Sequence, residues 1–391
     1  MKRFSAQYVF TNSGPALKRA VITTEFDGTI SNVEDTGGNL KETDNVEIHN
    51  GIIIPGFVNC HCHLELSHMK GSVGEGTGLS GFLMQVTKTR ESKTENIIAS
   101  ARSADKYMYD EGVSLCADIC NTPISFGIKQ ESRIHYINLL EIFASDPEKA
   151  LSRIEDLTKV AAAANEKKLP YNLVPHAVYS MSLDLLSLLR EKSSNNRVTS
   201  IHFMETAAEK EFLENHAGPL LSLFTMSGLA PEKLKTPESH TDIILNKLTL
   251  AGNLILVHNT FADKETIRNV KKRGKLFWCL CPGSNIYIEN KVPPLDLLIE
   301  EGCEIVIGTD SLASNKKLSI LEELKILQLN FPSVSIEDLV KWATVNGAKA
   351  LDEENSFGKI EPGKKPGLLL LQNVDLINMK LLPESTVTRL I

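Results

Sequence analysis

The chain has 391 residues, which is long enough for one large domain and a smaller one. It carries 42 basic and 49 acidic residues, a net charge of −7, and no strongly basic stretch, so nucleic-acid binding has no electrostatic support. The N-terminus lacks the apolar core of a signal peptide, no apolar run is long enough to span a membrane, and seven cysteines in apolar runs indicate reduced thiols, so we expect a cytoplasmic protein.

Both ends of the chain have the pattern of short β-strands. Residues 1–55 alternate apolar runs with turn residues. After a predicted helix at 336–350, the segment GKIEPGKKPGLLLL again combines glycine and proline turns with a strand-like run. We expect the two ends, 1–55 and 356–391, to pair into a small β-sandwich domain.

The body of the chain, residues 56–355, alternates apolar strand-like runs with helical patterns. Such runs separated by helices favour a parallel sheet, and eight of them predict a (β/α)₈ TIM barrel. A doubly wound open sheet is the alternative, but no glycine-rich phosphate turn follows the first strand. The predicted strands are 57–63, 113–119, 135–144, 171–178, 198–205, 254–259, 276–282 and 304–310.

Polar residues stand at the ends of these strands, where a barrel of this type carries its active site. Each has a structural explanation by itself, as a core histidine or as an acid at a helix start. Their convergence at one barrel end is hard to explain by packing, because buried polar groups cost free energy without a partner. They are His61 and His63 on strand one, His176 on strand four, His202 and Glu205 on strand five, His258 on strand six, and Asp310 on strand eight.

Four of these residues form a predicted metal site. His61 and His63 are two apart and point to the same face of their strand. With His202 and Asp310 they offer three nitrogens and one oxygen, leaving a position for water. Zinc fits these donors, and iron or manganese accept them too. We therefore expect one divalent metal ion, which lowers the pKa of a bound water so that hydroxide can attack the substrate.

The remaining residues supply proton transfer and substrate contacts. We expect Asp310 to accept a proton from the water, Glu205 to pass one to the departing nitrogen, and His258 to stabilise the attacking water or the oxyanion. A two-metal barrel needs a bridging ligand on strand four, normally a carbamylated lysine. That strand offers only His176, which we assign to the substrate.

Three hydroxyl or amide residues lie near the strand ends. Ser284 and Asn285, in the run CPGSN, are expected at the rim of the site, where they contact substrate, support the site or cap the next helix. Ser311 is expected to orient the Asp310 carboxylate.

Two long segments are candidate lids over the site. The first, 64–84, is rich in glycine and has no strong periodicity, and the second, 227–242, is long and polar. His216 and His240 are expected to face solvent or lie in loops, and have no assigned role.

The motifs together resemble a known family over nearly the whole chain. They are PGFVNCHCH (55–63), PHAVYS (175–180), HFMET (202–206), LVHN (256–259), CPGSN (281–285) and GTDS (308–311). With them the chain resembles the amidohydrolase superfamily, in its cytosine-deaminase-like and chlorohydrolase branch. The resemblance implies a homodimer.

The run HLELSH, residues 63–68, is similar to the aminodeoxyfutalosine deaminases of this branch, which belong to menaquinone biosynthesis. By that likeness Glu65 contacts the ribose or another polar part of the substrate. The alternative is a rim carboxylate bonded to backbone or to His68.

We therefore expect a mononuclear aminohydrolase that removes the exocyclic amine of a small heterocyclic substrate as ammonia. The resemblance points to an adenine nucleoside such as 6-amino-6-deoxyfutalosine. One alternative is hydrolysis of another C–N or C–Cl bond, in a ring amide, a formimino group or a chlorotriazine. The other is a non-catalytic scaffold, although every expected ligand position is filled.

Overall fold

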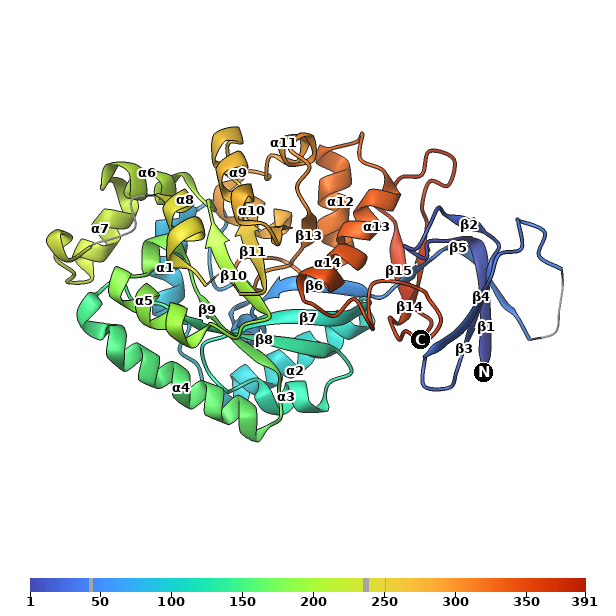
Figure 1. Cartoon of the computed structure of the whole chain (residues 1–391), viewed down its shortest axis with the longest axis horizontal. Helices are drawn as coiled ribbons and strands as arrows, with labels where there is room; N and C mark the ends of the chain where they lie inside the picture. Colours follow the sequence, from blue (N-terminus) through green and yellow to red (C-terminus); the bar gives the residue numbers. More distant parts are fainter. Residues whose placement is uncertain (42–44, 235–238, 250) are drawn as a thin grey trace.

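The computed structural model describes residues 1–41, 45–234, 239–249 and 251–391. A small sheet that contains both termini lies at one end of the molecule, and a larger body of strands surrounded by helices makes up the rest (Figure 1). The boundary falls at Gly56, between a strand of the small sheet that ends at Pro55 and the first strand of the body, which begins at Phe57.

The small sheet pairs the two ends of the chain. Strand β14 is antiparallel to β5, with Leu369 opposite Ile54. All seven strands form one hydrogen-bonded sheet in the order β15-β14-β5-β1-β3-β4, with β2 on β1. It has a core of its own, which includes Phe4, Ile22 and Leu370. The strands are β1 (Lys2–Val9), β2 (Leu17–Lys18), β3 (Val21–Thr24), β4 (Ile30–Glu34), β5 (Glu47–Pro55), β14 (Leu368–Gln372) and β15 (Thr386–Arg389).

The body contains the eight parallel strands that the apolar runs predict, in two four-stranded sheets. Most strands end earlier than predicted, so that His63, His176, Glu205 and Asp310 lie just beyond them. The first sheet contains β6 (Phe57–Cys62), β7 (Val113–Cys120), β8 (His135–Ile142) and β9 (Tyr171–Pro175). The second contains β10 (Val198–Phe203), β11 (Asn253–His258), β12 (Leu276–Leu280) and β13 (Ile305–Ile307).

Two seams join these sheets into a barrel. At the first seam the His202 N–H donates to the His176 carbonyl over 2.8 Å. At the second seam the N–H groups of Thr309 and Asp310 each donate to the His61 carbonyl over 3.0 Å. The TIM-barrel prediction is confirmed, and both seams pass through residues of the predicted site.

The helices lie around the outside of the strands (Figure 1). None in the described ranges is long and apolar enough to cross a membrane. They are α1 (Gly78–Thr89), α2 (Thr94–Asp110), α3 (Phe126–Glu131), α4 (Ala150–Glu166), α5 (Leu183–Lys192), α6 (Ala207–Asn215), α7 (Gly218–Met226), α8 (His240–Asp242), α9 (Lys264–Val270), α10 (Pro282–Glu289), α11 (Leu295–Glu300), α12 (Ile320–Asn330), α13 (Ile336–Trp342) and α14 (Val345–Ala350).

Two segments differ in their helices from what the sequence pattern indicates. The segment 64–84, which has no strong periodicity, contains the short helix η1 (Leu64–Met69) and the start of α1, and its role as a lid stays a prediction. The single helix expected at 336–350 is broken around Thr344, whose hydroxyl accepts a hydrogen bond of 2.8 Å from Asn12 of the small sheet domain. Of the other lid candidate, residues 235–238 lie outside the described part of the chain.

One buried ion pair lies in the barrel wall. The ammonium of Lys129, on α3, contacts the carboxylate of Asp118, on β7, and both side chains have 0% exposure. Lys129 also lies 2.8 Å from Asn138 Oδ1 and 2.9 Å from Cys120 Sγ. Asp118 in turn accepts the N–H of Leu64, the first residue of η1, over 2.7 Å. The pair therefore ties the start of η1, just after His63, to the wall.

Candidate active site

Three predicted metal ligands converge closely. The Nε2 atoms of His61 and His63 are 3.2 Å apart, and they lie 3.5 and 3.3 Å from Asp310 Oδ1. All three side chains are buried. Donor atoms held about 2.0–2.1 Å from a tetrahedral zinc ion are separated by roughly 3.4 Å. The spacing of these atoms therefore fits a metal ion.

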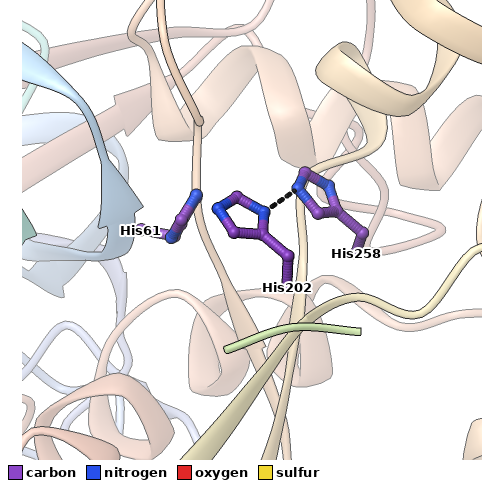
Figure 2. A group of neighbouring side chains, drawn as sticks. All are labelled: His61, His202 and His258. Carbon is purple, nitrogen blue, oxygen red and sulfur yellow. Dashed lines mark hydrogen bonds between the residues drawn. The ribbon is translucent and has the colours of Figure 1, made fainter. Parts of the chain in front are cut away.

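The fourth predicted ligand, His202, lies beside His61 but in a different group. His61, His202 and His258 are within metal-binding reach of one another, as are His61, His63 and Asp310. Figure 2 shows the His202 ring between the other two, with its Nδ1 2.9 Å from His258 Nε2. The Nε2 atom of His202 is buried and has no hydrogen-bond partner in the described chain. This atom is free to coordinate a metal.

Asn285 completes a line of hydrogen bonds behind His202. If His202 binds a metal through Nε2, its Nδ1 carries the proton and donates to His258 Nε2. His258 Nδ1 then carries the second proton and needs an acceptor. The Asn285 amide lies 3.1 Å from that atom, and its Oδ1 has no other partner in the described chain. Rotating the amide by half a turn supplies the acceptor.

Asp310 is held by two serines through its second oxygen. The hydroxyls of Ser284 and Ser314 each donate to Oδ2 over 2.6 Å. Ser311 was expected to do this, but its hydroxyl lies 3.0 Å from that of Ser314. Ser284 and Asn285 are both almost fully buried. Their contacts with Asp310 and His258 favour support of the site over direct contact with substrate.

The backbone at the strand ends is strained where the site residues lie. Met204, His258, Asn259 and Asp310 all have positive φ angles, between 47° and 78°. This left-handed region costs non-glycine residues of order 1 kcal/mol or more, and such strain gathers at functional sites. These left-handed residues lie where β10 and β11 end and just beyond β13.

A glycine brings two of these strand ends together. In the GTDS motif, a Cβ on Gly308 would lie 2.8 Å from the His61 Cβ and 2.9 Å from Cys279 Sγ. Only glycine allows the chain before Asp310 to approach His61 this closely. The motif thus has a packing reason as well as a chemical one.

The predicted ligands have the protonation states that suit a metal. Burial lowers the pKa of His63 to about 3 and lowers the pKa values of His61 and His258 as well. Burial opposes ionisation of Asp310, but its contacts with His61 and His63 hold its pKa well below the usual range. The histidines are therefore neutral and the carboxylate is charged at neutral pH. His202 differs: burial lowers its pKa, but the carboxylates around it, with Glu141 first, raise it to about 9.

Glu205 lies beside the cluster and lines the adjoining cavity. Its Oε1 is 3.6 Å from His258 Nε2. Burial, strengthened by the charges of Asp310 and Glu209 and opposed by His202, raises its pKa to about 8. Glu205 therefore holds a proton at neutral pH.

The start of α6 fixes Glu205. The Thr206 side chain caps the helix by accepting the Glu209 N–H, and Glu209 reaches back to accept the Glu205 N–H over 2.8 Å. His240 then lies 2.9 Å from the other oxygen of Glu209. His240 was expected to face solvent or to lie in a loop, but it is 5% exposed and its contact with Glu209 braces this turn. His216 is exposed, as expected.

Glu141, at the end of β8, is a residue of the site that the sequence reasoning missed. Its Oε1 lies 3.7 Å from His202 Nε2, and it forms a third potential metal-binding group with His176 and His202. Its pKa is lowered, because His176 and His202 outweigh the effect of burial. Its place inside the apolar run HYINLLEIFA could have indicated a role in the site, because a buried charge needs a partner. His176 lines the cavity, and its Nδ1 is 2.8 Å from the Ser180 hydroxyl.

Glu65 contacts backbone N–H groups, which is what its interpretation as a rim carboxylate predicts. Its carboxylate accepts the N–H groups of Asn121 and Thr122 over 3.2 Å each, and the Thr122 hydroxyl over 2.9 Å. Burial raises its pKa to about 7 against the effect of these bonds. Contact between Glu65 and a substrate stays a prediction.

A cavity of about 640 Å³ opens directly above the ligand cluster. This volume lies in the range of pockets that enclose whole small molecules, about 300–1,000 Å³. Its floor carries His63, His202 and Asp310, and its walls are mostly apolar. The wall residues include Leu66, Leu79, Phe82, Leu83, Met84, Val86, Phe143, Tyr179, Leu223, Phe224 and Met226.

Comparison with known proteins agrees with this geometry. The amidohydrolase family profile matches residues 52–388. An adenosine deaminase of Helicobacter pylori is 30% identical over 328 residues, which cover 82% of this chain and 78% of that protein. A 5-methylthioadenosine/S-adenosylhomocysteine deaminase of Pyrococcus abyssi is 26% identical and covers 80% and 72%.

Solved structures show the same fold. The aminofutalosine deaminase of H. pylori, in complex with methylthio-coformycin, superposes with a TM-score of 0.75 at 25% identity, over 97% of this chain and 94% of that one. The atrazine chlorohydrolase TrzN of Arthrobacter aurescens TC1, complexed with zinc, has a TM-score of 0.73 at 14% identity, over 98% and 89%. The chain therefore belongs to the amidohydrolase family and is a hydrolase of carbon–nitrogen bonds.

Proposed function

We propose that the protein deaminates an adenine nucleoside, and that its substrate is 6-amino-6-deoxyfutalosine or a close relative. The observation that carries this proposal is the placement of the Glu205 carboxyl group beside the predicted ligand cluster, where it lines a large and mostly apolar cavity. The similar proteins that are named as deaminases of adenosine, methylthioadenosine and aminofutalosine support it.

The ligand cluster is proposed to hold one divalent ion, best zinc, through His61, His63, His202 and Asp310. Such an ion supplies an acidified water as the nucleophile. A zinc-bound relative of the same fold supports the choice of metal. Because His202 holds a proton in the metal-free state, binding through its Nε2 displaces that proton.

The chain's own residues are proposed to move the protons. Asp310, ionised at neutral pH, accepts a proton from the attacking water. Glu205 gives its proton to the departing nitrogen, so that ammonia leaves rather than an amide anion. His258 Nε2 accepts the Nδ1–H of His202 and holds that ring in place. His176, on the cavity wall, is assigned to the substrate.

Hydrolysis of a C–Cl bond is a weaker candidate, although a chlorohydrolase shares the fold. Chloride leaves as a stable anion and needs no proton, whereas an amine does. A carboxyl group whose pKa is raised to about 8 is therefore better suited to an amine leaving group.

Ammonia release tests the proposal. The metal-loaded protein is incubated with 6-amino-6-deoxyfutalosine, adenosine, 5′-methylthioadenosine, a chlorotriazine and a lactam. We expect ammonia from the adenine nucleosides, fastest with the first. Release of chloride or opening of the lactam without ammonia from any nucleoside would contradict the proposal. A neighbouring gene for menaquinone synthesis would favour the first substrate.

A further inference from the structure

The turn that follows β10 is held by two backbone contacts beside the proposed proton donor. The strand ends at Phe203, and the next residue, Met204, has a φ angle of 47°, in the left-handed region. The carbonyl of Met204 accepts the N–H of Phe261 over 2.9 Å, and the N–H of Glu205 donates to Glu209 Oε2 over 2.8 Å. Left-handed backbone is unfavourable for a residue with a side chain. The position of Glu205 therefore depends on contacts that keep this turn from relaxing.

Glu209 differs by one residue from the usual capping arrangement of a helix. In that arrangement, the acid three residues after the N-cap accepts the backbone N–H of the N-cap itself. The N-cap of α6 is Thr206, whose hydroxyl accepts the Glu209 N–H over 3.2 Å. The Glu209 carboxylate instead accepts the N–H of Glu205, one residue before the cap. This bond therefore fixes the backbone of the proton donor as well as the start of the helix.

His240 holds the other oxygen of the Glu209 carboxylate. Its Nε2 lies 2.9 Å from Glu209 Oε1, and because a carboxylate oxygen accepts, Nε2 carries the proton. The His240 ring is nearly perpendicular to the Phe203 ring, with centroids 5.4 Å apart. Glu209 is fully buried and His240 almost so, so solvent does not readily replace a bond that is lost here. The segment 227–242, which contains His240, thus contacts the site behind Glu205.

We infer that Glu209 and His240 are positioning residues for proton transfer, because together they fix the backbone that carries the Glu205 carboxyl group. The inference rests on the proposed function, in which Glu205 gives its proton to the departing nitrogen, and deepens it. A proton donor acts only within hydrogen-bond reach of the atom that it protonates, so a small displacement of Glu205 slows the chemical step. Neither Glu209 nor His240 lines the described part of the cavity, so substrate binding should not depend on them.

Steady-state deamination by metal-loaded variants tests the inference. We expect Glu209→Ala to lower kcat by about 10- to 100-fold and to leave KM within about threefold, because the chemical step is displaced and binding is not. His240→Ala should lower kcat by about 3- to 10-fold, the factor that one buried hydrogen bond supplies. Glu209→Gln should recover most of the loss, since its amide oxygen still accepts the Glu205 N–H and His240 can accept from its NH₂ group after a change of tautomer. Glu211→Ala and His216→Ala, which remove exposed residues on α6 and at its end, should change neither constant.

A double-mutant cycle separates positioning from a general structural role. If His240 acts only through Glu205, its removal costs nothing further once the Glu205 carboxyl group is gone. We expect His240→Ala to change kcat of Glu205→Gln by less than about twofold, whereas a general loss of structure would lower kcat again by the full factor. Independent losses in the cycle overturn the inference. So does unchanged kcat in His240→Ala and Glu209→Gln if Glu209→Ala does not fold or keeps its kcat, and so does a loss that appears in KM alone.

Hydrogen exchange at the Glu205 amide separates this inference from the proposed function. We expect the amide to be protected in the wild-type protein and to exchange faster in Glu209→Ala and His240→Ala, with no change in Glu211→Ala. Equal exchange in the wild-type protein and in both site variants overturns the inference, whatever the protein deaminates. Absence of ammonia from every nucleoside, while Glu209 and His240 still protect this amide, counts against the proposed function alone.

Discussion

Glu323, a buried carboxylate on α12, ties together two loops that carry site residues. It accepts the Gly283 N–H over 2.7 Å, next to Ser284, and the Asn315 side-chain N–H over 2.7 Å. Asn315 also donates to the Thr309 carbonyl over 2.8 Å, directly before Asp310. Burial raises the pKa of Glu323 to about 8 against the effect of these bonds. The folded protein therefore keeps a proton on this group that the unfolded chain has lost.

This difference makes stability depend on pH. An unfolded glutamate has a pKa of about 4.3, so between about pH 4 and pH 8 the folded state binds more protons, and the free energy of unfolding falls as pH rises. Over 3 to 4 pH units, the ionisation of Glu323 lowers the free energy of unfolding by about 5 kcal/mol. The glutamine in Glu323→Gln does not titrate. Its NH₂ group, however, faces one of the two N–H donors that Glu323 accepts, so one hydrogen bond is lost and the free energy of unfolding falls by about 1–3 kcal/mol at every pH.

We therefore expect Glu323→Gln to be less stable than the wild-type protein at pH 5, and the gap to close or reverse by pH 8. Urea unfolding of both proteins at pH 5, 6, 7 and 8, with equal metal content, measures the difference, and effects of other groups cancel in it. Parallel pH dependence of the two proteins would refute the reasoning, because it would show that Glu323 ionises alike in the folded and unfolded states.

Four further predictions concern the site and its supports. Glu205→Gln should keep its metal, measured by elemental analysis, and lose about 10²- to 10⁴-fold in ammonia release, and unchanged turnover would exclude its role as the acid. Lys129→Met should leave the charge of Asp118 buried and unpaired, lowering the free energy of unfolding in urea by about 3–5 kcal/mol, so a change under 1 kcal/mol would count against the pair. Gly308→Ala should displace His61 and weaken metal retention in dialysis, with full occupancy as the contrary result. Removal of metal by a chelator should abolish turnover and lower the melting temperature, and zinc should restore both.

The barrel and the convergence of polar residues at one of its ends could be predicted from the sequence because two strong patterns coincide there. The apolar runs mark the buried strands, and polar residues interrupt them where the strands end. His61, His63 and Asp310 converge because parallel strands bring these ends to one face. The strand ends themselves were predicted too late, since the turn at Asp310 uses a left-handed backbone that no local pattern reveals.

Other features depend on contacts between distant segments. The helical content of 64–84 was hidden by its glycines, and η1 is tied to the barrel wall by Asp118 on β7. His240 was expected to face solvent or to lie in a loop because its partner, Glu209, lies 31 residues away. Glu141 was overlooked because its strand reads as core until it is placed beside His202.

The two seams of the barrel link its closure to the binding of a metal ion. Asp310 and His61 close one seam by hydrogen bonds between their backbones, while their side chains face the same metal position. His202 closes the other seam in the same way. A metal ion held by these residues would link the two halves of the barrel, each of which is a four-stranded sheet. Metal binding and closure of the barrel are then linked equilibria. Slower hydrogen exchange at the Thr309 and Asp310 amides after metal is added would show that the metal stabilises the closed barrel.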